Sequence, residues 1–232
     1  YQYYFIWLWP CSSYNNSMKY FLIAGEASGD LHASNLMAEL KQQDHEAEFC
    51  FLGGDLMQAQ GGQLIKHYRD MAFMGFINVL LNLRKVLANL EDCKRAIAHF
   101  KPDVVILIDY PSFNLRIAKY VKKQFQTPVY YYISPKLWAW KSYRIKSIKR
   151  YIDKMYTIFP FETEFYAQYN YPVTYVGNPT VDSITHFHAS KNNRNFREEN
   201  KLDSRPIVAL LAGSRRQEIS KCLPTMVEMA DK

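Results

Sequence analysis

Short apolar runs alternate along this chain with segments in which apolar side chains recur at helical spacing. The first run, residues 19–24 (KYFLIA), ends in the sequence GEASGD. After it, apolar side chains recur at intervals typical of one helix face, at Leu31, Leu36, Met37 and Leu40. This order predicts a strand, a turn and a helix.

The same order recurs further along the chain. Later apolar runs span residues 47–52, 103–108 (DVVILI) and 129–133, and a helical pattern over residues 92–99 leads into the second of them. Continuous β-branched runs that alternate with helices indicate an α/β fold with a parallel sheet covered on both faces. Because such sheets bind ligands at the carboxyl ends of their strands, we expect GEASGD, IDYPSFN and ISPKLWAW to meet in one crevice.

The chain changes character after residue 177. Residues 191–204 (KNNRNFREENKLDS) are polar and charged, which favours an interdomain connection. Residues 206–212 (PIVALLA) then restart the strand-turn-helix pattern, with a helix from about Glu218. We therefore expect an extension outside the fold over residues 1–17, with Met18 as the start, then a first domain over 18–190, a linker over 191–205 and the beginning of a second domain over 206–232.

Composition narrows the class of protein. The 232 residues are 48% apolar and 22% charged, which is typical of a globular chain and not of a disordered one. A formal net charge of +7 favours anionic partners such as phosphates, nucleic acid or an acidic lipid surface. The four cysteines form no C-x-x-C pair, so they indicate a reducing cytoplasm and no zinc site or disulfide framework. No apolar run reaches the length of a membrane-spanning helix, about 18 residues.

The first turn has two glycines and two acids. Gly25 and Gly29 permit a tight turn and a close backbone approach, and amides at the start of the next helix can hold an anion or a sugar oxygen. Glu26 and Asp30 favour hydroxyl recognition over phosphate, because carboxylates repel a phosphate. An ordinary strand-to-helix turn explains the same residues equally well.

Asp109 places a carboxylate where a buried strand is expected to enter the crevice. Partial desolvation there raises the pKa of a carboxyl group toward the range of a general base. The alternatives are that Asp109 caps the next helix or pairs with a Lys or Arg. Asn114 is a candidate for orienting a hydroxyl, or a simple turn residue.

Residues 74–90 (MGFINVLLNLRKVLANL) have a narrow stripe of polar side chains and a broad apolar face. A buried helix explains this pattern. An amphipathic segment that dips into a bilayer surface, with Arg84 and Lys85 at the headgroups, explains it too.

Basic charge is concentrated over residues 136–154, where seven Lys and Arg residues alternate with Trp138, Trp140, Tyr143 and Tyr151. Such a segment is suited to single-stranded nucleic acid or to an anionic lipid interface. A solvated helix with aromatic side chains in the core is the third interpretation.

Two further motifs concern ligands. Gly213, Ser214 and Arg215 combine flexible amides with a guanidinium at a predicted helix start, which suits a diphosphate. His186 and His188 lie near no third ligand at metal spacing, so we assign no metal.

Taken in order, seven segments resemble the lipid-A-disaccharide synthase family. They are AGEASGD (24–30), MGFINVLLNLRKVL (74–87), KPDVVILIDYPSFN (101–114), ISPKLWAWKSYRIKSIKR (133–150), FPFE (159–162), YPVTYVGNP (171–179) and LAGSRRQEI (211–219). The S-P-x-x-W-A-W box is the most specific of them. Where members of the family often have P-G-S-R, this chain has Ala212 before Gly213, which leaves the turn intact.

The resemblance implies a GT-B fold with two Rossmann-like domains, of which this chain holds the acceptor-binding first and only the start of the nucleotide-sugar-binding second. It implies a hexosyltransferase that moves 2,3-diacylglucosamine from its UDP ester to 2,3-diacylglucosamine 1-phosphate, with UDP as the other product. No cofactor is implied, because the UDP-sugar is a substrate. The implied location is the cytoplasmic surface of the inner membrane, with no nucleic-acid partner, and we expect this chain alone to be inactive.

The resemblance also implies roles for single residues. Asp109 matches the catalytic base, and Gly25, Glu26 and Asn114 match the acceptor crevice. Trp138, Lys141 and Arg144 are assigned to the acceptor phosphate and Gly213, Ser214 and Arg215 to the donor diphosphate. The membrane-facing patch comprises Ile77, Val79, Leu80, Leu83, Val86 and Leu87.

Two other functions are compatible with the same residues. A nucleic-acid-binding module would use residues 136–154. An enzyme of the same fold with another UDP-sugar substrate would keep the crevice and change the acceptor. The broad apolar face over residues 74–90 favours a lipid acceptor over a soluble one.

Overall fold

The computed structural model describes residues 17–71, 83–139, 142–190, 195–213 and 216–230. By its internal contacts the chain divides into two units, one up to Asp182 and one from Ser183 onward. The division falls within helix α9 (Pro179–Ser190), somewhat earlier than the domain end expected at residue 190. The two units are described separately below.

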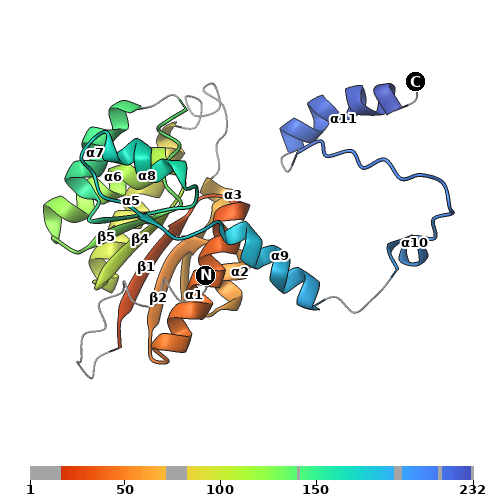
Figure 1. The fold of residues 1–232 in the computed structure, drawn as a ribbon. Coiled ribbons are helices and arrows are strands. Elements are labelled where there is room, and N and C mark those ends of the chain that lie inside the picture. The colour runs from red at the N-terminus through yellow and green to blue at the C-terminus, as the bar shows by residue number, and fades with distance from the viewer. Residues whose placement is uncertain (1–16, 72–82, 140–141, 191–194, 214–215, 231–232) are drawn as a thin grey trace. The chain divides into compact units, whose positions relative to one another are not determined.

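A parallel seven-stranded sheet forms the centre of the first unit, in the order β3-β2-β1-β4-β5-β6-β7 (Figure 1). Its strands are β1 (Lys19–Ala24), β2 (Glu48–Gly53), β3 (Gln63–His67), β4 (Val104–Ile108), β5 (Val129–Tyr132), β6 (Lys154–Thr157) and β7 (Thr174–Tyr175). Each of the four predicted apolar runs coincides with or overlaps one of these strands, so the predicted parallel sheet is confirmed.

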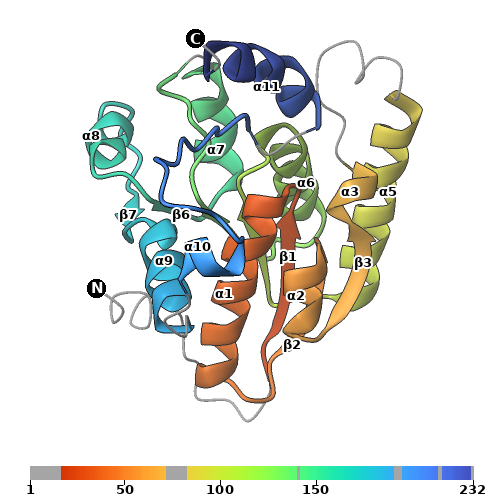
Figure 2. The same ribbon diagram turned by 90° about the vertical axis from the view of Figure 1, so that its right-hand side faces the viewer.

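Helices cover both faces of this sheet (Figures 1 and 2). They are α1 (Ala27–Gln43), α2 (Asp55–Ala59), α3 (Tyr68–Met71), α5 (Leu83–Phe100), α6 (Pro111–Gln124), α7 (Ile145–Tyr151) and α8 (Phe161–Ala167). The helix predicted over residues 92–99 is the second half of the longer α5. The basic segment 136–154 includes a short 3-10 turn (Ser142–Arg144), then α7 and the first residue of β6.

Alternate residues of each strand enter two separate apolar cores, because successive side chains of a strand point to opposite faces. One core joins Phe21 and Ile23 of β1 to α5, α6, α7 and α8. The other joins Leu22 and Ala24 to α1 and α2. The continuous apolar strands of the sequence therefore correspond to a sheet that is buried on both sides.

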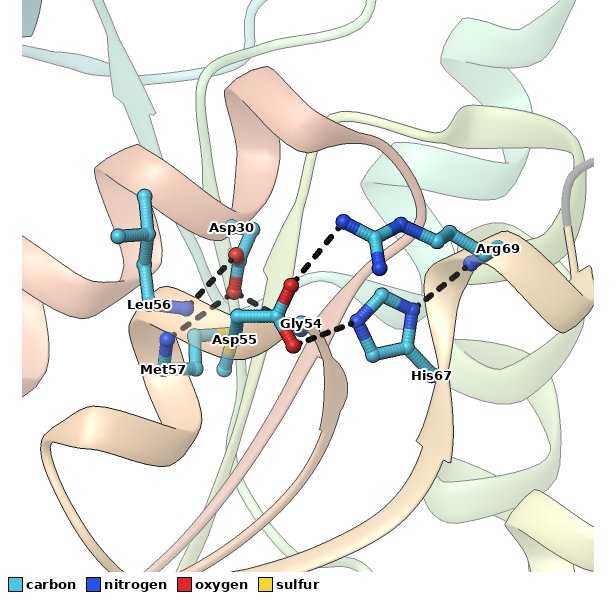
Figure 3. Close-up of polar contacts among 7 residues, drawn as sticks. All are labelled: Asp30, Gly54, Asp55, Leu56, Met57, His67 and Arg69. Carbon is cyan, nitrogen blue, oxygen red and sulfur yellow. Dashed lines mark hydrogen bonds and ion pairs between the residues drawn. The ribbon is translucent and has the colours of Figure 1, made fainter.

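A buried carboxylate, Asp30, fixes the start of helix α2 (Figure 3). Its oxygens accept hydrogen bonds from the backbone N–H groups of Gly54 at 2.8 Å, Leu56 at 3.1 Å and Met57 at 3.1 Å. These are amides of the kind that a short helix leaves without intrahelical partners. Asp30 is thus a helix cap between α1 and α2, and the idea that it helps to recognise a ligand hydroxyl is wrong for this conformation.

A surface network next to this cap ties α2 to the end of β3. The carboxylate of Asp55 lies 3.1 Å from the Arg69 guanidinium and 3.4 Å from Nε2 of His67. The backbone N–H of Arg69 donates to Nδ1 of His67 at 3.1 Å (Figure 3). These contacts are largely solvent-exposed, so each stabilises the fold by less than the Asp30 cap does.

We expect Asp30→Asn to lower the free energy of unfolding by about 2–3 kcal/mol, because the buried carboxylate makes several charge-assisted hydrogen bonds. Urea denaturation of the chain measures this change. Asp55→Asn is the matched control and should change the free energy by less than about 1 kcal/mol. Equal losses in the two variants would contradict the assignment of Asp30 as the principal cap.

The second unit contains the short helix α10 (Phe196–Glu199) and the longer α11 (Arg216–Ala230). The helix expected from about Glu218 is therefore present. The strand expected over residues 206–212 is not: this segment has no strand pairing, and its apolar side chains are largely exposed. A strand is stabilised by hydrogen bonds to a neighbouring strand, and none pairs with this segment within the described part of the chain. The assignment of 206–232 to a second domain stays a prediction.

Candidate active site

Strands β1 and β4 are neighbours at the centre of the sheet, and the strand order reverses between them. The connection after β1 leads to β2 on one side, and the one after β4 leads to β5 on the other. The carboxyl ends of two such strands are the usual ligand position in open α/β sheets. Glu26 follows β1 and Asp109 follows β4, so the two acids flank this position as the sequence predicted.

The electrostatic surroundings of Asp109 suit a proton acceptor. Burial raises the pKa of its carboxyl group first, and the negative charge of Glu26 raises the pKa further. The positive charge of Lys136 and a hydrogen bond from the backbone N–H of Tyr110 act in the opposite direction. Glu26 after β1 and Lys136 after β5 thus lie close enough to Asp109 to shift the pKa of its carboxyl group.

The alternative roles considered for Asp109 do not fit this geometry. The N-cap of α6 is Tyr110, and no side-chain hydrogen bond caps that helix. Among the described residues, no Lys or Arg lies within ion-pair distance of the Asp109 carboxylate. Within the described ranges of the chain, the carboxylate of Asp109 therefore has the backbone N–H of Tyr110 as a hydrogen-bond donor and no ion-pair partner.

Asp109 and Tyr110 both have left-handed backbone conformations, with φ of 43° and 45°. This turn redirects the chain from β4 into α6. The side-chain amide of Asn114 donates to the carbonyl of Asp109 at 2.7 Å and to that of Ile108 at 3.2 Å. Asn114 is fully buried. Asn114 thus supports the turn from inside the fold. The prediction that its side chain lines the acceptor crevice is wrong, because the side chain has no exposed surface.

Gly25 is required by close packing at the end of β1. A Cβ atom at this position would overlap the ring of Tyr110, which lies directly against the glycine. The hydroxyl of Tyr110 lies 3.4 Å from the carbonyl oxygen of Met71, and its ring stacks on Phe113. Gly25 therefore lets the turns after β1 and β4 approach each other, which is a packing role beside any contact with a ligand.

The loop after β5 is held by a buried carboxylate, Glu162, for which the sequence alone indicated no role. The hydroxyl of Ser134 donates a hydrogen bond to one carboxylate oxygen of Glu162, whose other oxygen accepts from the backbone N–H groups of Ile158 at 3.2 Å and Phe159 at 3.0 Å. The segments S-P-x-x-W-A-W and FPFE are thereby joined in space. In the sequence, the only indication of this contact was that both motifs occur in the same chain, since neither motif alone predicts it.

Two predicted acceptor-binding side chains lie near this loop. Trp138 is 43% exposed and packs edge-on against Phe161, with ring centroids 5.1 Å apart. Arg144 is half-buried and donates to the hydroxyl of Ser112 at 2.8 Å, so it lies at the start of α6. Both side chains are accessible at the same edge of the sheet as Asp109.

The remaining predicted site residues are only partly described. Gly213 has a φ of 108°, a conformation that favours glycine. Leu87 is 49% exposed and Val86 is half-buried on α5, whereas the side chain of Leu83 is not described. Outside the described residues lie Ile77, Val79, Leu80, Lys141, Ser214 and Arg215.

Comparison with protein families identifies the family of this chain. A family model described as lipid-A-disaccharide synthetase matches residues 20–232. The chain belongs to this family. The resemblance inferred from the seven segments is thereby confirmed.

Individual members of the family are similar over most of this chain. The lipid-A-disaccharide synthase of Myxococcus xanthus is 41% identical over 218 residues, which cover 94% of this chain and 56% of that protein. The enzyme of the same name from Geobacter metallireducens is 40% identical over 210 residues, covering 90% and 54%. The chain therefore spans about half the length of the curated relatives that it matches.

Solved structures with a similar fold come from more distant proteins. UDP-N-acetylglucosamine 2-epimerase from Rickettsia bellii matches with a TM-score of 0.58 and 12% identity, over 81% of this chain and 52% of that one. The UDP-GlcNAc 2-epimerase of Neisseria meningitidis, bound to UDP-GlcNAc, matches with a TM-score of 0.53 and 13% identity, over 72% and 48%. At this identity the likeness concerns the fold, and it supports the predicted GT-B class.

None of the helices in the described part of the chain combines the length and the apolar character that crossing a bilayer requires.

We expect Gly25→Ala to lower the free energy of unfolding by about 1–3 kcal/mol, because the added methyl group overlaps the Tyr110 ring and the core must shift. Thermal and urea unfolding measure the change. Gly29→Ala is the control: its methyl group would meet the nearest atom, Cβ of Ala24, at 3.3 Å, and alanine favours a helix. Equal stability of Gly25→Ala and the unchanged protein would contradict the close packing described here.

Proposed function

We propose that the protein to which this chain belongs is an inverting glycosyltransferase that forms the lipid A disaccharide. It transfers 2,3-diacylglucosamine from its UDP ester to the 6-hydroxyl of 2,3-diacylglucosamine 1-phosphate and releases UDP. Family membership over residues 20–232 supports the reaction class. The observation that carries the proposal is the position of Asp109, a partly desolvated carboxylate where the strand order reverses.

In the proposed reaction Asp109 acts as the general base. Its carboxylate takes the proton of the acceptor 6-hydroxyl while that oxygen forms a bond to C1 of the donor sugar. The bond between C1 and the diphosphate oxygen breaks, and UDP leaves with the electron pair. Attack from the face opposite the leaving group inverts the configuration at C1. The raised pKa of Asp109 makes the carboxylate a better proton acceptor than an ordinary aspartate.

The other predicted residues take supporting roles in this proposal. Glu26 lies beside Asp109 and is suited to bind an acceptor hydroxyl, and the backbone at Gly25 lines the same position. Trp138, Lys141 and Arg144 are assigned to the acceptor and its phosphate. Gly213, Ser214 and Arg215 are assigned to the donor diphosphate, where a guanidinium stabilises the departing charge.

We expect Asp109→Asn to lower kcat by about a hundredfold or more, since an amide cannot accept the proton. The assay is acceptor-dependent UDP release by a protein extended to the full length of its relatives. Asp103→Asn is the matched control: it makes the same change at the other end of β4, where the carboxylate accepts a hydrogen bond from the backbone of Lys19. Near-normal turnover of Asp109→Asn would refute the assignment of the base.

The same assay has a defined pH dependence. The base must be ionised to act, so kcat/KM should fall as the pH drops through the pKa of Asp109. Because burial and Glu26 raise that pKa, the fall should occur at a higher pH than for an ordinary aspartate, whose pKa is about 3.9. A fall centred at or below that value would show that Asp109 does not titrate as proposed.

We also propose that the protein acts at the cytoplasmic face of the inner membrane and that the membrane-facing patch within residues 74–87 contacts the lipid. An acceptor with two acyl chains resides in a bilayer, and Leu87 exposes an apolar side chain on α5. Arg84 and Lys85 are exposed beside it, as a segment at an anionic surface requires.

Replacing Ile77, Val79, Leu80 and Leu83 with Ser should weaken binding to anionic vesicles more than about tenfold, since each inserted side chain contributes about 1.5 kcal/mol. Vesicle flotation measures the bound fraction. The control carries Ser at four apolar positions that are exposed elsewhere, Leu56, Phe125, Val181 and Ile184. Unchanged flotation of the first variant, or an equal loss in the control, would contradict a specific lipid-binding patch.

A further inference from the structure

The turn that presents Asp109 is strained. Two consecutive residues with side chains, Asp109 and Tyr110, occupy the left-handed region, which costs about 1–2 kcal/mol per residue relative to the right-handed one. Such backbone persists only where the surrounding structure fixes it, and it is common where a side chain must be aimed. The contacts that fix this turn are therefore informative about function.

Two buried side chains converge on the carbonyl oxygen of Asp109. The hydroxyl of Tyr131 donates a hydrogen bond to it, and the Nδ2 amide of Asn114 donates another at 2.7 Å. Both residues have no exposed surface. A carbonyl oxygen has two lone pairs, so these two donors saturate it.

The donors come from two different elements. Tyr131 lies on β5, the strand next to β4, and Asn114 lies in the first turns of α6. These hydrogen bonds fix the backbone of Asp109 relative to both the sheet and the helix. Its own N–H also donates to the carbonyl of Tyr132 on β5, at 3.2 Å.

The hydroxyl of Tyr131 is not needed to fill the core, since a phenylalanine ring occupies almost the same volume. Burial of a phenol in the apolar core costs free energy unless the hydroxyl is hydrogen-bonded. The carbonyl of Asp109 is the partner that the structure supplies, and it belongs to the residue that we propose as the general base. The hydrogen bond from the Tyr131 hydroxyl therefore affects the orientation of the Asp109 carboxylate.

We propose that Tyr131 and Asn114 are positioning residues, whose hydrogen bonds to the Asp109 carbonyl hold the carboxylate of the base in line with the acceptor hydroxyl. The proposal rests on the function proposed above. Neither side chain touches the substrate, because both are buried behind the turn. They act by fixing the backbone from which the catalytic side chain extends.

Tyr131→Phe tests the proposal in the full-length enzyme. We expect kcat to fall by about tenfold to a hundredfold, the range that a misaligned reacting group produces, with KM within about twofold. The acid limb of the kcat/KM profile should move to lower pH, because a released carboxylate gains solvent and loses the burial that raises its pKa. A purely structural role would leave both the kcat and this limb unchanged.

Tyr171→Phe is the matched control. This tyrosine is also buried, and its hydroxyl donates to a backbone carbonyl, that of Ile152 at 3.0 Å, next to β6. The same atom is removed from the same kind of hydrogen bond. We expect comparable changes in melting temperature for the two variants, but normal kcat only for Tyr171→Phe.

The outcomes separate this proposal from the one on which it rests. If Asp109→Asn keeps full turnover, the proposed base is wrong, whatever Tyr131→Phe does. If Asp109→Asn is inactive and Tyr131→Phe has normal kcat and pH profile, the base stands and the positioning role is refuted. Failure of Tyr131→Phe to fold would also refute it, because the hydrogen bond would then be a requirement of folding. Asn114→Ser, which removes the second donor, should reproduce the loss of kcat.

Discussion

Parallel pairing of β1 with β4 is the constraint on which the rest of this structure depends. It joins two segments that lie about 80 residues apart in the sequence, with Ala24 opposite Ile108 in the last register pair. Everything that follows these residues is therefore brought to one point. Glu26 and Asp109 become neighbours because their strands end together, and the close approach of the two turns requires a glycine at position 25.

This juxtaposition places two negative charges close together in a partly desolvated region, which is electrostatically unfavourable. Lys136 offsets part of the repulsion from the end of β5. A positive charge that follows a third strand thus reduces the repulsion between Glu26 and Asp109. The packing of the sheet, whose central strands are buried on both faces, offsets this electrostatic cost. A carboxylate with a raised pKa can therefore be held in the folded protein.

The sequence was sufficient to predict four of the seven strands, their parallel arrangement and the emergence of Asp109 at a strand end, because apolar runs and the residues after them are local patterns. The short strands β3, β6 and β7 have no such run and were not predicted. Asp30, Asn114 and Glu162 could not be assigned in this way. Each hydrogen-bonds the backbone, and the partners of Asp30 belong to a different turn, whose position depends on tertiary packing. Glu162 accepts from nearby backbone N–H groups and also from the side chain of Ser134, which lies in a different loop. A polar residue near a predicted turn has the same appearance in the sequence whether it binds a ligand or a peptide group.

Asp30, Glu162 and Asp109, three of the carboxylates near this edge of the sheet, differ in how their lone pairs are used. Asp30 accepts from three backbone N–H groups, and Glu162 accepts from two and from the Ser134 hydroxyl. The carboxylates of Asp30 and Glu162 therefore stabilise the fold. Asp109 receives a hydrogen bond from the N–H of Tyr110, and the donors of Tyr131 and Asn114 reach its carbonyl and not its carboxylate. The turn is thus held through the backbone, which leaves carboxylate lone pairs available for a proton. Further hydrogen bonds to the carboxylate itself, beyond the one from Tyr110, would have stabilised its charge and weakened it as a base.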